Sequence, residues 1–100
     1  MTTAVPFTST VDFGATPTDE ATAVITGLTD MTTSAHVECW LQGDDTTADN
    51  VAANHDALQF CMSGPPQAEA RVAGTGFTAR FRLAFGLAKG TFKFHSVYAI

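Results

Sequence analysis

The sequence predicts an all-β protein, a small antiparallel β-sandwich of the Ig-like or jelly-roll-like kind, with one short helix or loop excursion around residues 46–56. Three observations lead to this prediction. Thr, Val, Phe and Ile recur at alternate positions, which is the period of a strand with one buried face. Gly, Pro and Asp interrupt these stretches at roughly ten-residue spacing, as in sandwiches and barrels. The 100 residues, 45% hydrophobic and 15% charged, suit one core, so we expect a single β domain over 1–100.

Alternation defines the strands expected in the first half of the chain. Residues 8–13 form the first strand, which ends at a turn that starts with Gly14, and residues 20–28 form the second. In the third, residues 34–42, an apolar set alternates with a polar set that contains Trp40. We expect the apolar set to face the core: Ala35, Val37, Cys39 and Leu41.

The second half of the chain carries the clearest apolar stripe. It runs through residues 77–85 at alternate positions, and we expect this strand to be central. Residues 86–90 are expected to connect it as a hairpin to a last strand, in which Phe92, Phe94 and Tyr98 alternate with polar residues and Val97. Between the two halves we predict a short helix over 51–55, capped by Asp49 or Asn50, and strands over 58–62 and 68–73.

The charges are divided along the chain. All ten acidic residues lie in residues 1–70 and all five basic residues in 71–100, for a net charge of -5. The two parts attract each other, either as paired strands of one sheet or as contacts between neighbouring copies. Five positive charges on an acidic domain make a poor footprint for phosphates, so we expect no nucleic-acid partner.

Residue types that carry chemistry are present, but not in catalytic or metal-binding patterns. Cys39 and Cys61 form no CxxC pair, and we expect free thiols in a reducing cytosol. The acidic loop 44–56 offers oxygen ligands to a hard cation, yet it lacks EF-hand spacing. The three histidines show no HxH or HxxxH spacing. We therefore predict no metal, no cofactor, no catalytic residue and no enzymatic activity.

The chain shows no sign of a membrane or of export. No apolar stretch approaches the ~20 residues of a spanning helix, and the start MTTAVPFTST lacks the features of a secretory signal. We expect no membrane partner and synthesis in the cytoplasm of the cell that makes the protein.

Interface candidates are side chains that are larger or more apolar than a solvated strand face needs. Trp40 lies on the polar face of its strand, and a Trp at a protein contact contributes ~2 kcal/mol or more. The alternative is that a second sheet or the 43–56 loop covers it. Charged neighbours and the late aromatic residues raise the same question, so the interface candidates are Trp40, His36, Glu38, Arg80, Arg82, Phe92 and Tyr98.

Several segments, in the same order along the chain, resemble small proteins encoded among the structural genes of tailed bacteriophages. The opening segments are 11–15, Pro17 and 20–27, and the later ones are 37–38, 45–49, His55, 74–78 and 90–93. The resemblance implies a virion component, near the tail or tail fibres or on the head as a decoration protein. Such proteins are commonly β-rich homo-oligomers. The resemblance assigns no functional residues to this chain.

These observations favour a bacteriophage virion structural protein that is made in the host cytoplasm, assembles symmetrically with itself and docks on other phage structural proteins. A homotrimer or another symmetric oligomer is expected. The alternative is a carbohydrate- or receptor-binding β-sandwich module that uses Trp40, His36 and the 43–56 loop.

Overall fold

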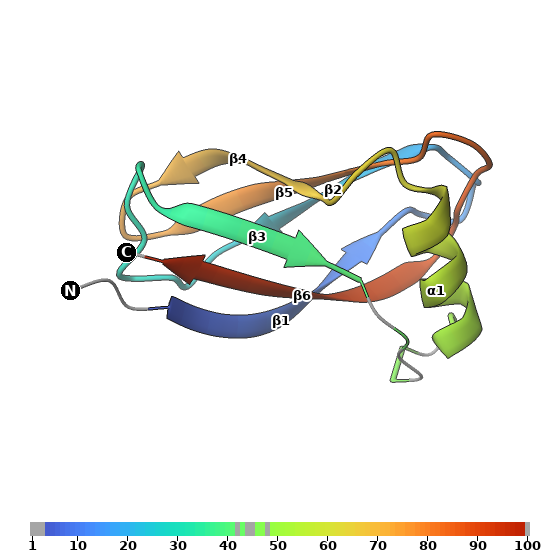
Figure 1. Ribbon diagram of the computed structural model, residues 1–100, viewed down its shortest axis with the longest axis horizontal. Coiled ribbons are helices and arrows are strands. Elements are labelled where there is room, and N and C mark those ends of the chain that lie inside the picture. Colours follow the sequence, from blue (N-terminus) through green and yellow to red (C-terminus); the bar gives the residue numbers. More distant parts are fainter. Residues whose placement is uncertain (1–3, 42, 44–45, 48, 100) are drawn as a thin grey trace.

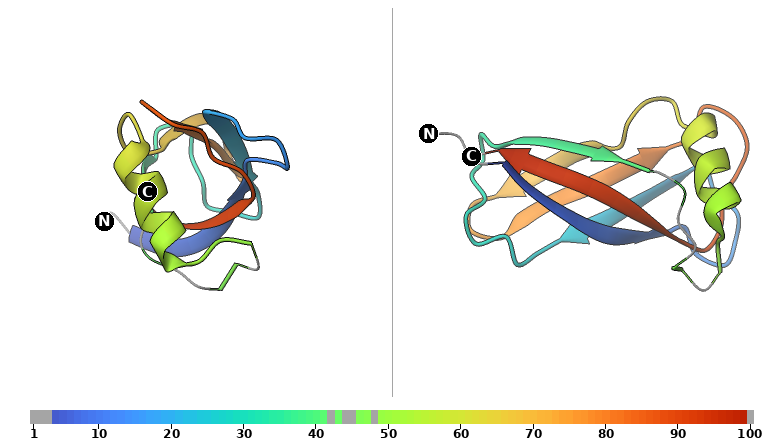
Figure 2. Two further views of the ribbon diagram at one scale, coloured as in Figure 1. Left: turned by 90° about the vertical axis from the view of Figure 1, so that its right-hand side faces the viewer. Right: turned by 60° about the horizontal axis from the view of Figure 1, so that its bottom comes forward.

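The computed structural model describes residues 4–41, 43, 46–47 and 49–99 and confirms the all-β prediction (Figure 1). Two antiparallel sheets pack face to face, and one helix lies across one end of the sandwich (Figures 1 and 2). The body measures 40 × 22 × 20 Å. In chain order the elements are β1 (Ala4–Asp12), β2 (Glu20–Ile25), β3 (His36–Trp40), α1 (Ala52–Cys61), β4 (Gln67–Val72), β5 (Gly76–Arg82) and β6 (Thr91–Ala99).

The first sheet has the strand order β1-β6-β3. β1 pairs with β6 along its whole length, from Ala4 opposite Ala99 to Asp12 opposite Thr91. β3 is shorter and pairs only with residues 95–99 of β6. Among the described residues, one side of residues 91–94 in β6 therefore has no partner strand, and its backbone groups need other hydrogen-bond partners.

The second sheet has the order β2-β5-β4, which confirms that β5 is a central strand. The register of β4 against β5 shifts between Glu69 and Val72, and Ala70 adopts a left-handed φ of 49° there, as expected for a bulge at a sheet edge. The hairpin expected at residues 86–90 is wrong, because β5 and β6 belong to different sheets. The 83–90 segment crosses from one sheet to the other.

The core consists mainly of the inward strand faces predicted by the alternation, but Phe85, the last residue of the predicted apolar stripe, is exposed. Phe81 of β5 and Phe94 of β6 are fully buried, and their rings meet edge to face at a centroid distance of 5.0 Å. Cys39 is also buried, as expected. Phe92 and Tyr98 are each only 3% exposed, so their assignment as interface candidates is corrected. They point inward from β6 because they share the parity of Phe94.

The strand expected over 58–62 is wrong, since α1 continues to Cys61. Ala, Leu and Gln favour a helix, and His55 and Leu58, three positions apart, are its two buried residues. Val51 occupies the N-cap position with no side-chain cap, so the predicted cap by Asp49 or Asn50 is also corrected. In the described part of the chain, no helix is long and apolar enough to cross a membrane.

Candidate protein interface

At the α1 end of the sandwich, polar side chains form hydrogen bonds with backbone groups on the unpaired side of β6. The Asp49 carboxylate accepts the backbone N–H of Thr91 at 2.8 Å. The Asn50 amide donates to the carbonyl oxygens of Thr91 at 3.0 Å and Lys89 at 3.3 Å. Nε2 of His55 accepts the backbone N–H of Lys93 at 2.9 Å. These side chains take the place of the strand that β3 does not extend far enough to supply.

His55 fixes α1 to the core as well as to β6. Its side chain is fully buried, and its ring meets Phe92 edge to face at 5.2 Å. Because Nε2 accepts a hydrogen bond, the ring hydrogen lies on Nδ1, which donates to the carbonyl of Val51 at 3.0 Å. Gln59 adds a further link, since its side-chain oxygen accepts the N–H of Leu41 at 3.2 Å. α1 is therefore held in one position against the end of the first sheet.

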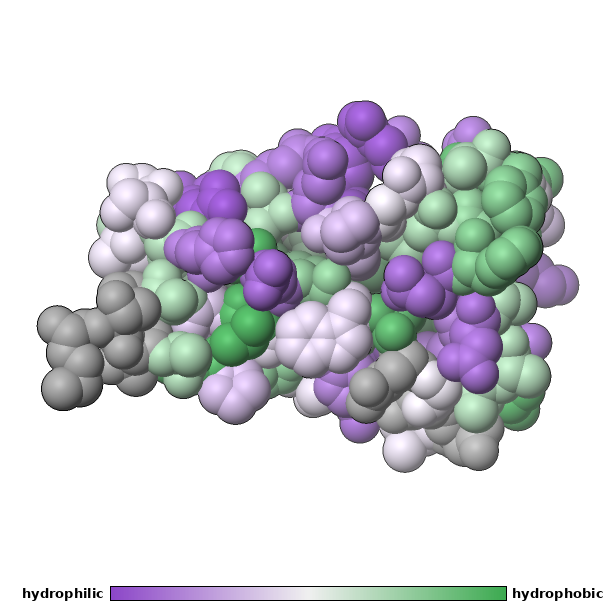
Figure 3. Space-filling model, in the orientation of Figure 1, coloured by the Kyte–Doolittle hydropathy of each residue, from purple (hydrophilic) through white to green (hydrophobic). Residues whose placement is uncertain are grey.

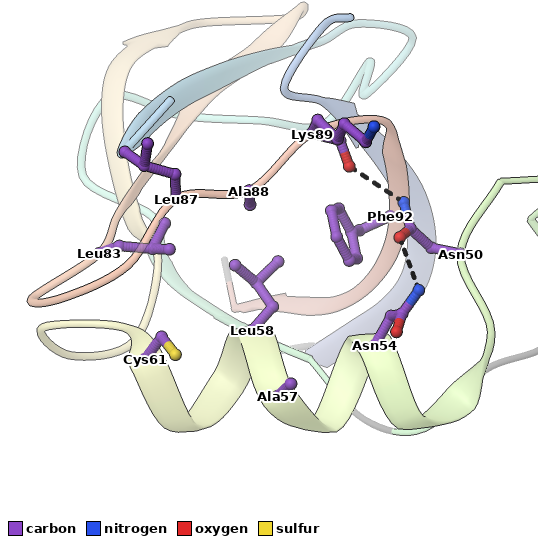
Figure 4. A pocket seen from close by; sticks show the side chains of 10 residues that line it. All are labelled: Asn50, Asn54, Ala57, Leu58, Cys61, Leu83, Leu87, Ala88, Lys89 and Phe92. Carbon is purple, nitrogen blue, oxygen red and sulfur yellow. Dashed lines mark hydrogen bonds between the residues drawn. The ribbon is translucent and has the colours of Figure 1, made fainter. Parts of the chain in front are cut away.

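An apolar cavity of about 290 Å³ lies between α1 and the 83–90 segment. Figure 4 shows Leu58 and Phe92 pointing into it from the helix and from β6. Asn50, Asn54 and Lys89 contribute its polar lining, and Asn54 donates to the Asn50 side chain at 3.0 Å. The remaining lining residues are apolar or carry sulfur: Ala57, Cys61, Leu83, Leu87 and Ala88.

Large apolar side chains of α1 and of the 83–90 segment, the two elements that enclose this cavity, project into solvent. Phe60 is 77% exposed, Phe85 54% and Leu87 65%. The rings of Phe60 and Phe85 contact each other at a centroid distance of 5.6 Å and an angle of 79°. Figure 3 shows hydrophobic surface gathered at the α1 end of the molecule. We call these three side chains together with the cavity the end surface. Exposed aromatic residues and an apolar hollow at one end of a molecule are typical of protein interfaces.

Phe60 and Phe85 were not among the residues that the sequence indicated. Phe60 fell in a segment interpreted as a strand, and Phe85 continued the core stripe of β5. A helical interpretation of residues 52–61 would have found Phe60, because it lies on the side of α1 opposite His55 and Leu58. Phe85 lies beyond the end of β5 and no longer follows its alternation.

The polar face predicted for β3 is confirmed as an outward face. Trp40 is 39% exposed and stacks on His95 of the neighbouring strand, with ring centroids 6.0 Å apart and an angle of 17°. His36 and Glu38 lie further along the same face, with Nε2 and Oε1 3.7 Å apart. The sandwich therefore leaves Trp40 accessible at its surface.

Arg80 and Arg82 lie on the other sheet, on the outward face of β5. The Arg80 guanidinium contacts Glu69 of β4 and Glu20 of β2, so it joins all three strands. Hydrogen bonds to Glu69 first, and then to Glu20, raise the pKa of Arg80. Arg82 Nε lies 3.8 Å from Glu20. These contacts place acidic and basic strands in one sheet, which is one of the two interpretations of the divided charge.

The acidic loop and the two cysteines are the remaining features that the sequence singled out. Asp44 and Asp45 lie outside the described residues, and the Asp49 carboxylate binds Thr91. Across 4–41, 43, 46–47 and 49–99, no group of three or more His, Cys, Asp or Glu residues could hold a metal ion.

Both cysteines are free thiols. Burial raises the pKa of the Cys39 thiol, and Sγ accepts a hydrogen bond from Ser96 at 3.3 Å, which lowers that pKa in part.

No known protein family matches this chain, and neither the curated proteins nor the solved structures include one that is similar to it.

Proposed function

We propose that the protein is a structural component of a tailed-bacteriophage virion, which assembles symmetrically with itself and docks on other virion proteins. The observation that supports this proposal is the end surface, where Phe60, Phe85 and Leu87 are exposed on the two elements that enclose an apolar cavity. A partner that covers these side chains gains roughly 25 cal/mol for each Å² of apolar area removed from water.

The construction of this end favours binding to another protein. Association is opposed by the ordering of side chains and segments at the contact. α1 is already fixed by the bonds of Asp49, Asn50 and His55 to β6, and the two exposed rings already contact each other. Little ordering remains when a partner binds, so more of the burial free energy contributes to affinity.

Light scattering coupled to size-exclusion chromatography tests the self-assembly. We expect an oligomer at micromolar concentration, and we expect Phe60→Ser combined with Phe85→Ser to lower its mass. Val24→Ser is the matched control, because Val24 is also exposed but lies on the outward face of β2. A monomer at every concentration, or an oligomer that the double variant leaves intact, would contradict this role of the end surface.

The virion assignment has a separate test. We expect mass spectrometry of purified phage particles to detect the chain in stoichiometric amount, and its gene to lie among portal, capsid and tail genes. A gene remote from such neighbours, with no chain in the particles, would reject the assignment.

A further inference from the structure

A groove runs between the free edges of β3 and β4, on the side of the sandwich away from β1. It consists of two adjoining hollows of about 600 and about 290 Å³ that share Val37, Pro65 and Pro66. The larger is also lined by Ser63, Gly64, Gln67, Ala68, Arg80 and Arg82, and the smaller by Glu38, Cys39 and Trp40. Figure 3 looks onto β3 and shows hydrophilic surface along the upper edge, over β4 and β5.

Trp40 gives one end of the groove a flat apolar surface. The indole is held by its stack on His95, yet it remains 39% exposed. A sugar ring presents a flat face of C–H groups, and an exposed indole offers a large, rigid surface for packing against such a face. Glu38 lies two residues away on the same outward face of β3, where its carboxylate can accept hydrogen bonds from hydroxyl groups.

Arg82 lines the other end of the groove, where its guanidinium offers a positive charge and N–H donors. Its side chain is 59% exposed, and its Nε lies 3.8 Å from Glu20, which is beyond hydrogen-bond length. Arg80 differs, because Glu20 and Glu69 both bind its guanidinium. A carboxylate in the groove would form paired hydrogen bonds with Arg82, the geometry that a guanidinium favours.

We propose that this groove binds an oligosaccharide that carries a carboxylate, with a sugar ring stacked on Trp40 and the acid group bound by Arg82. The site is separate from the end surface, so glycan binding is a second function beyond assembly and does not depend on it. An extended acidic peptide added to the edge of β3 is the competing occupant. We favour the glycan because main-chain pairing along β3 would make no use of the indole face.

Fluorescence provides a direct test, because Trp40 is the only tryptophan of the chain. An array of matched neutral and uronic-acid-bearing oligosaccharides is screened first, followed by titration with trigalacturonic acid and, for comparison, galactotriose. We expect the acidic trisaccharide to change the Trp40 emission and to bind more tightly than the neutral one.

Two variants separate the parts of the site, with affinities measured by calorimetry. Trp40→Ala should weaken binding of both sugars by about tenfold or more, the effect of losing ~1.4 kcal/mol of contact. Arg82→Gln should reduce the affinity for trigalacturonic acid to that for galactotriose and leave the neutral sugar unaffected. Phe60→Ser is the control and should leave both affinities unchanged, while an unaltered melting temperature shows that each variant is folded.

Other outcomes would overturn the proposal. They are no binding of any sugar on the array, equal binding of the two trisaccharides with no effect of Arg82→Gln, or binding of an oligoglutamate peptide in place of the sugars. Loss of oligomerisation in the Phe60 and Phe85 double variant with sugar binding intact would show that the two functions are independent.

Discussion

Nε2 of His55 accepts the backbone N–H of Lys93 at 2.9 Å, so a side chain of α1 fills a position in the sheet where a strand is missing. Asp49 and Asn50 satisfy the neighbouring backbone groups of β6. The helix that carries the end surface is thus attached to the sandwich by hydrogen bonds as well as by apolar packing. The stability of the fold and the geometry of the end surface depend on the same few residues.

His55→Ala should destabilise the protein by about 3 kcal/mol, because it leaves a cavity and removes the side-chain acceptor of the Lys93 N–H. Urea unfolding measures this loss. His36→Ala is the control, since His36 is exposed on the outward face of β3, and it should change the stability by less than about 0.5 kcal/mol. Equal stability of the two variants would show that the His55 contacts contribute little.

Arg80→Glu should lower the melting temperature more than Arg82→Glu does, because Arg80 contacts carboxylates on both neighbouring strands and Arg82 contacts one. The substitution places three carboxylates side by side across β2, β5 and β4. Added salt should reduce the difference by screening their repulsion. If Arg80→Glu instead lowers the oligomer mass and leaves the melting temperature unchanged, the charges pair between copies and not within the sheet.

Side-chain direction was the part of the structure that the sequence predicted best. Alternation is a local property of a strand, so the opposite directions of Cys39 and Trp40, and the inward direction of Phe81, follow from the order of residues alone. The central position of β5 followed from its dense apolar stripe. The alternation thus placed Trp40, which lines one end of the groove, on the outward face of its strand.

Pairing between distant segments was harder to predict. Nothing local in residues 83–90 shows that β5 and β6 belong to different sheets, and the end surface exists only because this segment meets α1. The interface candidates Phe92 and Tyr98 failed for a related reason. Their alternation indicated one apolar face but could not show whether a second sheet covers it.

Tyr98 should make the protein sensitive to alkali. Its hydroxyl donates to Asp30 at 2.5 Å, and this bond, followed by burial, raises the pKa of Tyr98 to about 12. The unfolded chain ionises near the ordinary value of 10, so this contribution to stability is complete below that pH and is lost as the pH rises through about 12. Urea unfolding across this range should show the loss.

Tyr98→Phe is the matched control for the alkaline loss. It should be less stable at neutral pH, because Asp30 loses its donor, and its stability should fall less between those two pH values. Tyr98 is the only tyrosine, so tyrosinate absorbance reports its ionisation directly. Ionisation near the ordinary value in the folded protein would contradict the role of the Asp30 bond.

The two thiols should react with iodoacetamide at different stages of unfolding. Cys39 is 3% exposed, and burial raises the pKa of its thiol, so little reactive thiolate forms at neutral pH. Cys61 is partly exposed and lines the cavity of the end surface. Mass spectrometry should therefore find Cys61 alkylated in the folded protein, while Cys39 is modified only in denaturant. A bulky maleimide on Cys61 should also lower the oligomer mass, because it occupies the cavity that Leu87 lines. Cys61→Ser controls for the label. Equal alkylation of both thiols in the folded state would contradict the burial of Cys39, and an unchanged mass after labelling would exclude the cavity from the contact.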